Sequence, residues 1–185
     1  KIYEPPLQYH YLKRPYELIP LSAESLPTVR YFDAEGRELP PDSAPERVAR
    51  SELEVRIRPG ILYQPHPAFA TDEAGKPLYL ALSEAEIASR HALSDFARTG
   101  TRELVAEDFI YQIKRLAHPR ATSPIFGHIS EYVEGLKELA ARLRKDNERI
   151  VAQHRERYGE ADKGLPWLDL RAYEPTGVTP VDRYA

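Results

Sequence analysis

ELVAEDFIYQIKRLAHPRATSP, residues 103–124, is the most strongly patterned stretch of the chain. It predicts a helix over 106–117, because an acidic pair, Glu107-Asp108, stands in the first turn and a basic pair, Lys114-Arg115, stands near the end, as the helix dipole favours. His118-Pro119 then ends the helix. The apolar residues recur at helical spacing and predict its buried face: Phe109, Ile110, Ile113, Leu116 and Ala117.

A second helix is predicted upstream of this stretch. Ser83 and Glu86 have the spacing of a capping box, in which Ser83 caps the helix and Glu86 reaches back to it. The helix is expected to run to about Arg98, where Thr99-Gly100-Thr101 breaks it.

A long helix is predicted downstream, over 129–157, after Ser123-Pro124 has opened the segment as N-cap and first-turn proline. We expect it to pack on the domain's own sheet, because Asn147 and His154 would fall in the core seam of a coiled coil. Its apolar face consists of Ile129, Val133, Leu136, Ala140, Leu143 and Ile150.

Proline separates the front of the chain from the rest. Twelve of the 17 prolines fall in residues 1–77, against two in residues 78–158. Since a helix interior does not tolerate proline, we expect strands and loops in 1–77, helices in 78–158, and a return strand near 177–181 within residues 159–185. The prediction is a single α+β module, with a small antiparallel sheet packed with helices.

Two strands are predicted in the front part. Residues 52–58 alternate polar and apolar side chains before Pro59-Gly60, which is typical of a half-buried strand followed by a turn. An earlier strand over 28–32 ends at a turn over 33–36. The other expected features are a loop over 39–45, an extended segment over 63–69 and a turn over 72–75.

The composition is that of an ordinary folded protein, with 42% hydrophobic and 30% charged residues. No apolar run is long enough to span a bilayer. A net charge of −3 gives no electrostatic case for binding nucleic acid, and the lack of cysteine excludes disulfides and thiolate metal sites. Because the chain begins at Lys1 and contains no methionine, we expect a leader or a longer segment to precede it.

No pattern of a catalytic or metal-binding site is found. There is no GxSxG elbow, and Gly75-Lys76-Pro77 lacks the preceding glycine of a phosphate loop. Glu107 and Asp108 point about 100° apart on their helix and do not form a facing acid–base pair. We predict that the chain is not an enzyme and has no cofactor and no metal. The histidines have no metal-ligand spacing and are expected to be surface or structural residues: His10, His66, His91, His118, His128 and His154.

Tyrosine is abundant, with 12 residues in the chain, and four of them crowd the N-terminal part. Tyr3, Tyr9, Tyr11 and Tyr16 could line a groove for a peptide or a sugar, because their rings bury area while their hydroxyls bond polar ligands. The other interpretation is that 9–11 is a strand with one wet and one dry face. The ligand-contacting residues stay unassigned.

Five segments, in register along the chain, resemble parts of one protein family. LVAEDF, with the following KR, P and SP over 104–124, is similar to an "LTAEDV…KR…P…SP" segment, and LEVRIRPGILYQPH (53–66) is similar to a strand of the type "YTFHLRKGVKWHDG". IYEPPL (2–7), LIPLSAES (18–25) and VTPVDRY (178–184) are similar to three further segments. The chain thus resembles the family 5 extracellular solute-binding proteins, the peptide- and nickel-type receptors of bacterial ABC importers.

The chain also departs from this family. Val105 stands where the family has a capping threonine, so the helix start must be capped from elsewhere. Residues 64–102 and 140–170 are longer than the family's spacing and are read as insertions.

The resemblance implies an internal fragment of the first lobe of a larger, two-lobed type II periplasmic binding protein, corresponding mostly to its small α+β subdomain Ib. The full-length receptor would bind an oligopeptide or a similar small solute by lobe closure and deliver it to an ABC permease in the inner membrane. The implied location is the periplasm (secreted, or lipid-anchored on the cell surface in a Gram-positive source). No ligand-binding residue of the family transfers to a matching motif here.

A second hypothesis belongs to a different class. A free-standing protein-interaction module would use the amphipathic helix over 129–157, because an apolar face that its own sheet does not cover needs another surface. It predicts self-association or a protein partner.

Overall fold

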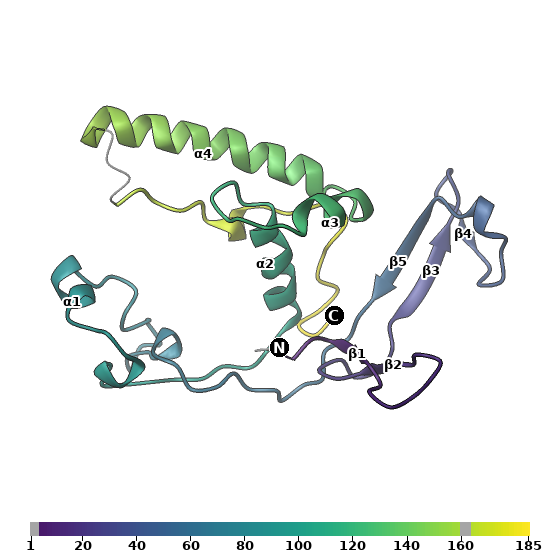
Figure 1. Ribbon diagram of the computed structural model, residues 1–185, viewed down its shortest axis with the longest axis horizontal. Helices are drawn as coiled ribbons and strands as arrows, with labels where there is room; N and C mark the ends of the chain where they lie inside the picture. Colours follow the sequence, from purple (N-terminus) through teal and green to yellow (C-terminus); the bar gives the residue numbers. More distant parts are fainter. Residues whose placement is uncertain (1–3, 160–163) are drawn as a thin grey trace. The chain divides into compact units, whose positions relative to one another are not determined.

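The computed structural model describes residues 4–159 and 164–185, and Figure 1 shows its helices and strands. The chain divides into two compact units, Lys1–Val105 and Ala106–Ala185. The fold class is α+β, with small antiparallel sheets and helices, as predicted. The predicted boundaries near residues 77 and 158 separate strand- and loop-rich sequence from helical sequence. They do not coincide with the boundary between the two compact units, which lies after Val105.

The first unit holds two small antiparallel sheets. β1 (Leu7–Tyr9) pairs with β2 (Leu18–Pro20). β3 (Thr28–Phe32) lies between β4 (Glu38–Leu39) and β5 (Arg50–Glu54), and the strand predicted over 28–32 is therefore confirmed. The predicted loop that follows β4 contains the start of a short 3-10 helix, η1 (Pro45–Arg47).

Two predicted turns in this unit are confirmed and share one construction. In each turn an aspartate carboxylate, of Asp33 or Asp72, accepts the backbone N–H groups two and four residues further on. The glycine three residues after each aspartate, Gly36 or Gly75, has a φ of 79° and donates its N–H to the backbone carbonyl of that aspartate. Glycine adopts this left-handed conformation without steric cost.

The prediction of a half-buried strand over 52–58 is wrong, both in the bounds of the strand and in its burial. β5 ends at Glu54, and Leu53 is 62% exposed. The alternation continues to Ile57, which is 2% exposed, but Ile57 pairs with Ala23 and not with β3. The alternating sequence over 52–58 therefore takes part in two separate backbone pairings. Residues up to Glu54 pair with β3, and Ile57 pairs with Ala23.

The segment between residues 61 and 104 has few regular elements. The extended segment predicted over 63–69 ends in a 3-10 helix, η2 (Pro67–Phe69). The predicted capping box of Ser83 and Glu86 is confirmed at the start of α1 (Glu84–Ala88), but the helix does not run to Arg98. The Asp95 carboxylate accepts the N–H groups of His91 and Ala92, which starts a separate 3-10 turn, η3 (Leu93–Asp95).

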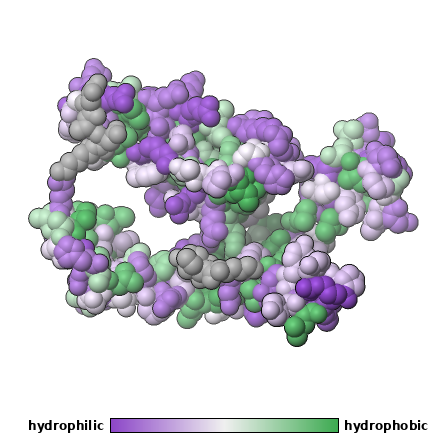
Figure 2. Space-filling view, in the orientation of Figure 1, coloured by the Kyte–Doolittle hydropathy of each residue, from purple (hydrophilic) through white to green (hydrophobic). Residues whose placement is uncertain are grey.

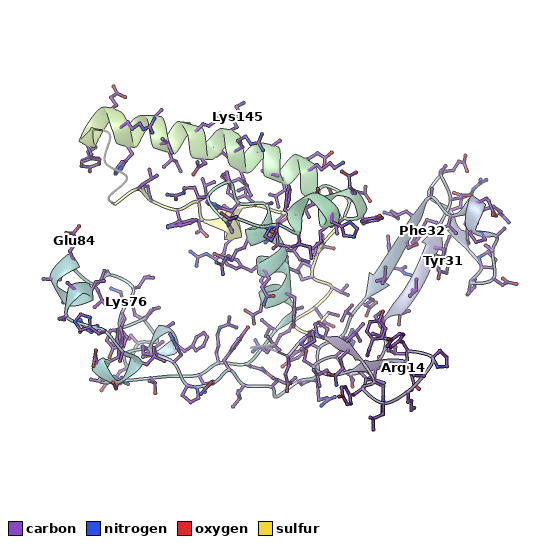
Figure 3. The ribbon with its side chains drawn as sticks, in the orientation of Figure 1. Arg14, Tyr31, Phe32, Lys76, Glu84 and Lys145 are labelled. Atoms are coloured by element: carbon purple, nitrogen blue, oxygen red, sulfur yellow. The ribbon has the colours of Figure 1, made fainter. Side chains whose placement is uncertain are left out.

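The second unit is built from helices α2 (Ala106–Leu116), α3 (Phe126–Tyr132) and α4 (Leu136–Tyr158) and a 3-10 helix, η4 (Leu170–Ala172). The helix predicted over 106–117 is confirmed as α2, which ends one residue earlier. Much of the surface of α4 in view is hydrophilic (Figure 2), and its exposed Lys145 points outward (Figure 3).

The prediction of one long helix over 129–157 is wrong, because this stretch contains two helices, α3 and α4, which are separated at Gly135. Gly135 has a φ of 75°, and a Cβ atom there would clash with the Thr176 hydroxyl and lie 2.9 Å from the Thr176 nitrogen. Ser123 is also not the N-cap of α3, which begins at Phe126 with Ile125 in the cap position.

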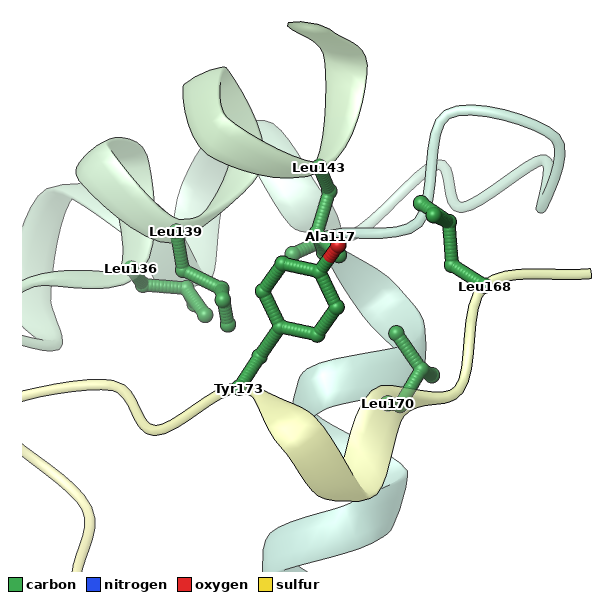
Figure 4. Packing of buried hydrophobic residues seen from close by; sticks show 7 residues of the cluster. All are labelled: Ala117, Leu136, Leu139, Leu143, Leu168, Leu170 and Tyr173. Atoms are coloured by element: carbon green, nitrogen blue, oxygen red, sulfur yellow. The ribbon is translucent and has the colours of Figure 1, made fainter. Parts of the chain in front are cut away.

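The core of the second unit lies between α4, the end of α2 and the segment over 168–173 (Figure 4). The prediction that the long helix packs on a sheet is wrong, since none of these elements is a strand in the described part of the unit. The cluster consists of Ala117, Leu136, Leu139, Leu143, Leu168, Leu170 and Tyr173.

The return strand predicted over 177–181 is also wrong. No strand is assigned over these residues. The Gly177 N–H donates to the Glu134 carbonyl, 43 positions earlier, and the Val181 N–H donates to the Ala185 carbonyl, which closes a local turn. Within residues 4–159 and 164–185, no helix is both long and apolar enough to cross a membrane.

Candidate functional site

Four of the six histidines that were predicted to be surface or structural residues make local contacts. His10 and His66 are local caps, because the Nδ1 atom of each accepts a backbone N–H two residues further on. His128 and His154 lie against tyrosines of their own helices. Among the described residues, no three His, Asp or Glu side chains are grouped so that they could hold a metal ion.

The N-terminal tyrosines do not fit the strand interpretation, and the groove interpretation stays a hypothesis. Tyr9 is 67%, Tyr11 87% and Tyr16 69% exposed, and β1 ends at Tyr9, so residues 9–11 are not a strand with one dry face. Tyr9 and Tyr16 meet edge to face, 5.8 Å apart, and the Arg14 guanidinium covers Tyr16 at 4.4 Å. Tyr3 lies outside the described residues.

The second unit contains a cavity of about 480 Å³, within the range of small-molecule sites. It forms where the end of α2, the loop over 118–122 and the segment over 167–170 meet. Its lining consists of Tyr111, Arg115, His118, Arg120, Ala121, Thr122, Trp167, Leu168 and Leu170.

Arg120 holds the wall of this cavity together. Its guanidinium donates to the carbonyls of Pro166 at 2.5 Å and Leu165 at 3.5 Å, across 45 residues of sequence. The same group lies 4.1 Å from the centre of the Trp167 ring, a cation–π contact. The His118 ring also lies against Trp167, with centroids 4.8 Å apart and planes at 42°.

His118 is 3% exposed, and its position fixes its protonation. Its Nδ1 atom accepts the Arg120 backbone N–H at 3.1 Å, so the neutral ring carries its proton on Nε2. Burial, with the positive charges of Arg120 and Arg115, lowers the pKa of His118 below its ordinary value of 6.5. The ring is therefore a neutral donor at pH 7.

Two buried donors beside the cavity have no hydrogen-bond partner among the residues that the structure describes: His118 Nε2 and Arg120 Nε. A buried polar atom without a partner is costly, and such atoms often indicate an absent ligand or water. Arg115 lines the same cavity and is exposed. Arginine and histidine donors against an apolar wall are suited to binding an anion, whereas no lining carboxylate in the described part of the chain could orient His118 as a base.

The sequence did not point to this site. The sequence predicts His118 only as a helix end and a surface or structural residue, and Arg115 only as a complement to the helix dipole. The contacts that join them are hydrogen bonds from Arg120 to backbone carbonyls, which no sequence spacing encodes. The one available signal was the single tryptophan of the chain, placed in a loop after proline. No family model, curated protein or solved structure matches the chain.

Proposed function

We propose that this chain is part of the first lobe of a peptide-type substrate-binding protein of an ABC importer, in the position of subdomain Ib. The full-length protein would close two lobes on an oligopeptide and deliver it to a membrane permease. In this proposal the chain frames the lobe, and the parts that hold the peptide lie elsewhere in the receptor.

The observation that carries the proposal is that the segments resembling the family contact one another. Ser22 and Ala23, in LIPLSAES, donate their N–H groups to the carbonyls of Pro5 and Pro6, in IYEPPL. The Ser22 carbonyl accepts the N–H of Arg58, in LEVRIRPGILYQPH. Three segments that are far apart in sequence are thus paired through their backbones.

The segment LEVRIRPGILYQPH (53–66) is also hydrogen-bonded to residues 103 and 104. The Gly60 N–H donates to the Glu103 carboxylate at 2.6 Å, and the Leu104 N–H donates to the Ile61 carbonyl at 2.8 Å. In the second unit the Ala106 N–H donates to the carbonyl of Arg183, in VTPVDRY, at 3.0 Å. This bond also caps the start of α2, where Val105 replaces a threonine. Each of the five segments that resemble the family is thus hydrogen-bonded through its backbone to another of the five.

The alternative, a free-standing interaction module, has less support. Its premise is an apolar helix face without a cover, whereas Leu136, Leu139 and Leu143 of α4 are at most 2% exposed within their own unit. We therefore retain the receptor as the proposal.

An antibody raised against this chain tests the proposal in fractionated cells of the source organism. We expect a band several times larger than 21.2 kDa in the periplasmic or cell-envelope fraction. Antibody absorbed beforehand with the purified chain is the control. A cytosolic band of about 21 kDa would contradict the proposal.

The longer protein then tests the ligand class. A mixture of short peptides should bind to it in native mass spectrometry, and its radius of gyration in solution scattering should fall as the lobes close. Failure to bind peptides would remove the peptide assignment, whatever the result for the cavity in Ala106–Ala185.

A further inference from the structure

We propose that the cavity of the second unit binds a small organic carboxylate with an apolar body. The carboxylate accepts hydrogen bonds from Arg115, His118 Nε2 and Arg120 Nε, while the apolar body lies against Leu168, Leu170 and the Trp167 ring. The proposal does not rest on the receptor assignment, because every residue in it belongs to Ala106–Ala185.

The charge around the cavity favours an anion. Two arginines line it, and none of the lining residues in the described ranges is acidic. Asp169 is the nearest acid in sequence, but both of its carboxylate oxygens accept hydrogen bonds from Arg171, at 2.8 Å each. A carboxylate that enters the cavity therefore meets uncompensated positive charge.

The unpartnered donors favour an acceptor with two oxygens. Nδ1 of His118 is already an acceptor for the Arg120 N–H, and the terminal nitrogens of Arg120 already donate to Leu165 and Pro166. His118 Nε2 and Arg120 Nε are the nitrogens left over. A carboxylate offers about four lone-pair sites and accepts from several donors at once, and hydrogen bonds to a charged acceptor are the strong ones.

The remaining lining selects an apolar body. Leu168 is 8% and Leu170 3% exposed, so both present buried apolar surface, while Trp167 is 64% exposed. Because both nitrogens are buried, the proposal requires the exposed Trp167 ring to turn as the ligand enters. Trp167 is the single tryptophan of the chain, so its fluorescence reports on this cavity alone.

The test is a fluorescence titration of the full chain with phenylacetate, at constant ionic strength and with selective excitation of tryptophan. We expect a saturable change. Phenylacetamide has the same shape without the charge and should bind at least about tenfold more weakly, since a charge-assisted hydrogen bond contributes about 1.5 kcal/mol or more. Acetate, which lacks the apolar body, should also bind more weakly.

Two variants test the residues. Arg115→Gln should weaken phenylacetate binding about tenfold. Arg155→Gln, an exposed arginine of α4 outside the cavity, is the matched control and should leave binding unchanged. Both positions are exposed, so both variants should fold, which circular dichroism checks.

Three results would overturn the proposal. The first is equal affinity for phenylacetate and phenylacetamide, and the second is an unchanged affinity in Arg115→Gln. The third is no saturable binding at millimolar concentration by either fluorescence or calorimetry. Binding of phenyl phosphate without binding of phenylacetate would replace the carboxylate by a phosphate.

Discussion

His118 shows how one buried ring couples the cavity to stability. Burial and the charges of Arg120 and Arg115 lower its pKa in the folded protein, whereas the unfolded chain takes up the proton near the ordinary value of 6.5. Below that pH the unfolded state binds more protons than the folded state. The free energy of unfolding therefore decreases as the pH falls through this range.

The variant His118→Gln should remove this part of the pH dependence. We expect the wild-type free energy of unfolding to be level from about pH 8 to pH 7 and to decrease toward about pH 5, and the variant to lose part of that decrease. Urea unfolding at a series of pH values measures it. His91→Gln, at an exposed histidine, is the control and should keep the wild-type slope. Equal slopes in His118→Gln and wild type would contradict the prediction.

Gly135 is a position where only glycine fits. Gly135→Ala should destabilise the protein by about 2 to 3 kcal/mol, because its φ is 75° and the added Cβ meets Thr176. Gly127→Ala in α3 is the control, since nothing lies within 4 Å of a Cβ there, and it should be neutral or slightly stabilising. Thermal unfolding of both variants compares them, and similar melting temperatures would contradict the prediction.

At this scale, the sequence predicts a residue's role when the partner is close in the chain. The capping box of Ser83 and Glu86 and the Asp33 turn were predicted correctly, since their hydrogen bonds span three or four residues. The cavity residues were missed, because Arg120 and Pro166 are joined only by the folded chain.

Among the elements, α2 was predicted correctly to within one residue at its end, but the burial of Lys114 was missed. The sequence analysis assigned Lys114 to the helix dipole, but it did not predict that the Lys114 side chain is 4% exposed and pairs with Glu107, which lies 3.1 Å away and is 48% exposed. The pair spans two turns, so that the buried ammonium group reaches a carboxylate at the surface.

Glu107→Gln should destabilise the protein by about 1 to 2 kcal/mol, because it leaves a buried ammonium group with a neutral partner, although the half-exposed carboxylate limits the cost. Glu131→Gln removes an ion pair of 2.7 Å with Lys137 in which both side chains are exposed, and should cost less than about 0.5 kcal/mol. Chemical unfolding of the two variants provides the comparison. If Glu107→Gln lowers the free energy of unfolding by no more than Glu131→Gln does, the prediction that the pair with buried Lys114 is the more stabilising one is contradicted.

The helices downstream were predicted less well because their limits depend on distant contacts. The apolar spacing over 129–157 is continuous, and nothing local ends it before Gly135. The break falls at Gly135, which has a φ of 75°, and Thr176, 41 positions further on, packs against it and leaves no room for a side chain. The missing return strand has in part the same cause, since the Gly177 N–H donates to the distant Glu134 carbonyl, while the Val181 N–H closes a local turn with Ala185.

At the scale of the whole molecule, the two units differ in their cores. Five of the described residues in Lys1–Val105 are buried hydrophobics, namely Ala23, Phe32, Leu39, Ile57 and Ala70. The second unit has a continuous cluster of leucines with Tyr173, whose hydroxyl donates to Asp146 at 2.8 Å. The α+β class was predictable from proline distribution and periodicity, but this division was not, because it depends on which segments share a core.

Residues 106–185 expressed alone should fold, because the whole leucine cluster lies within them. We expect a helical circular dichroism spectrum and cooperative thermal unfolding. Residues 1–105 alone should unfold with little cooperativity, since their core is small. A non-cooperative transition for 106–185 would show that its core needs the first unit.

β5 is an edge strand of its sheet, and its alternating charges have a consequence for solubility. An unpaired edge is a template on which strands of other molecules add. Here Arg50, Glu52 and Glu54 stand at alternate positions of that edge, and Glu52 also pairs with Arg30 of β3 at 2.7 Å. A second molecule that approached the edge would have to desolvate these charges. The alternating charged residues, which predicted a half-buried strand, thus oppose aggregation at the β5 edge of the sheet.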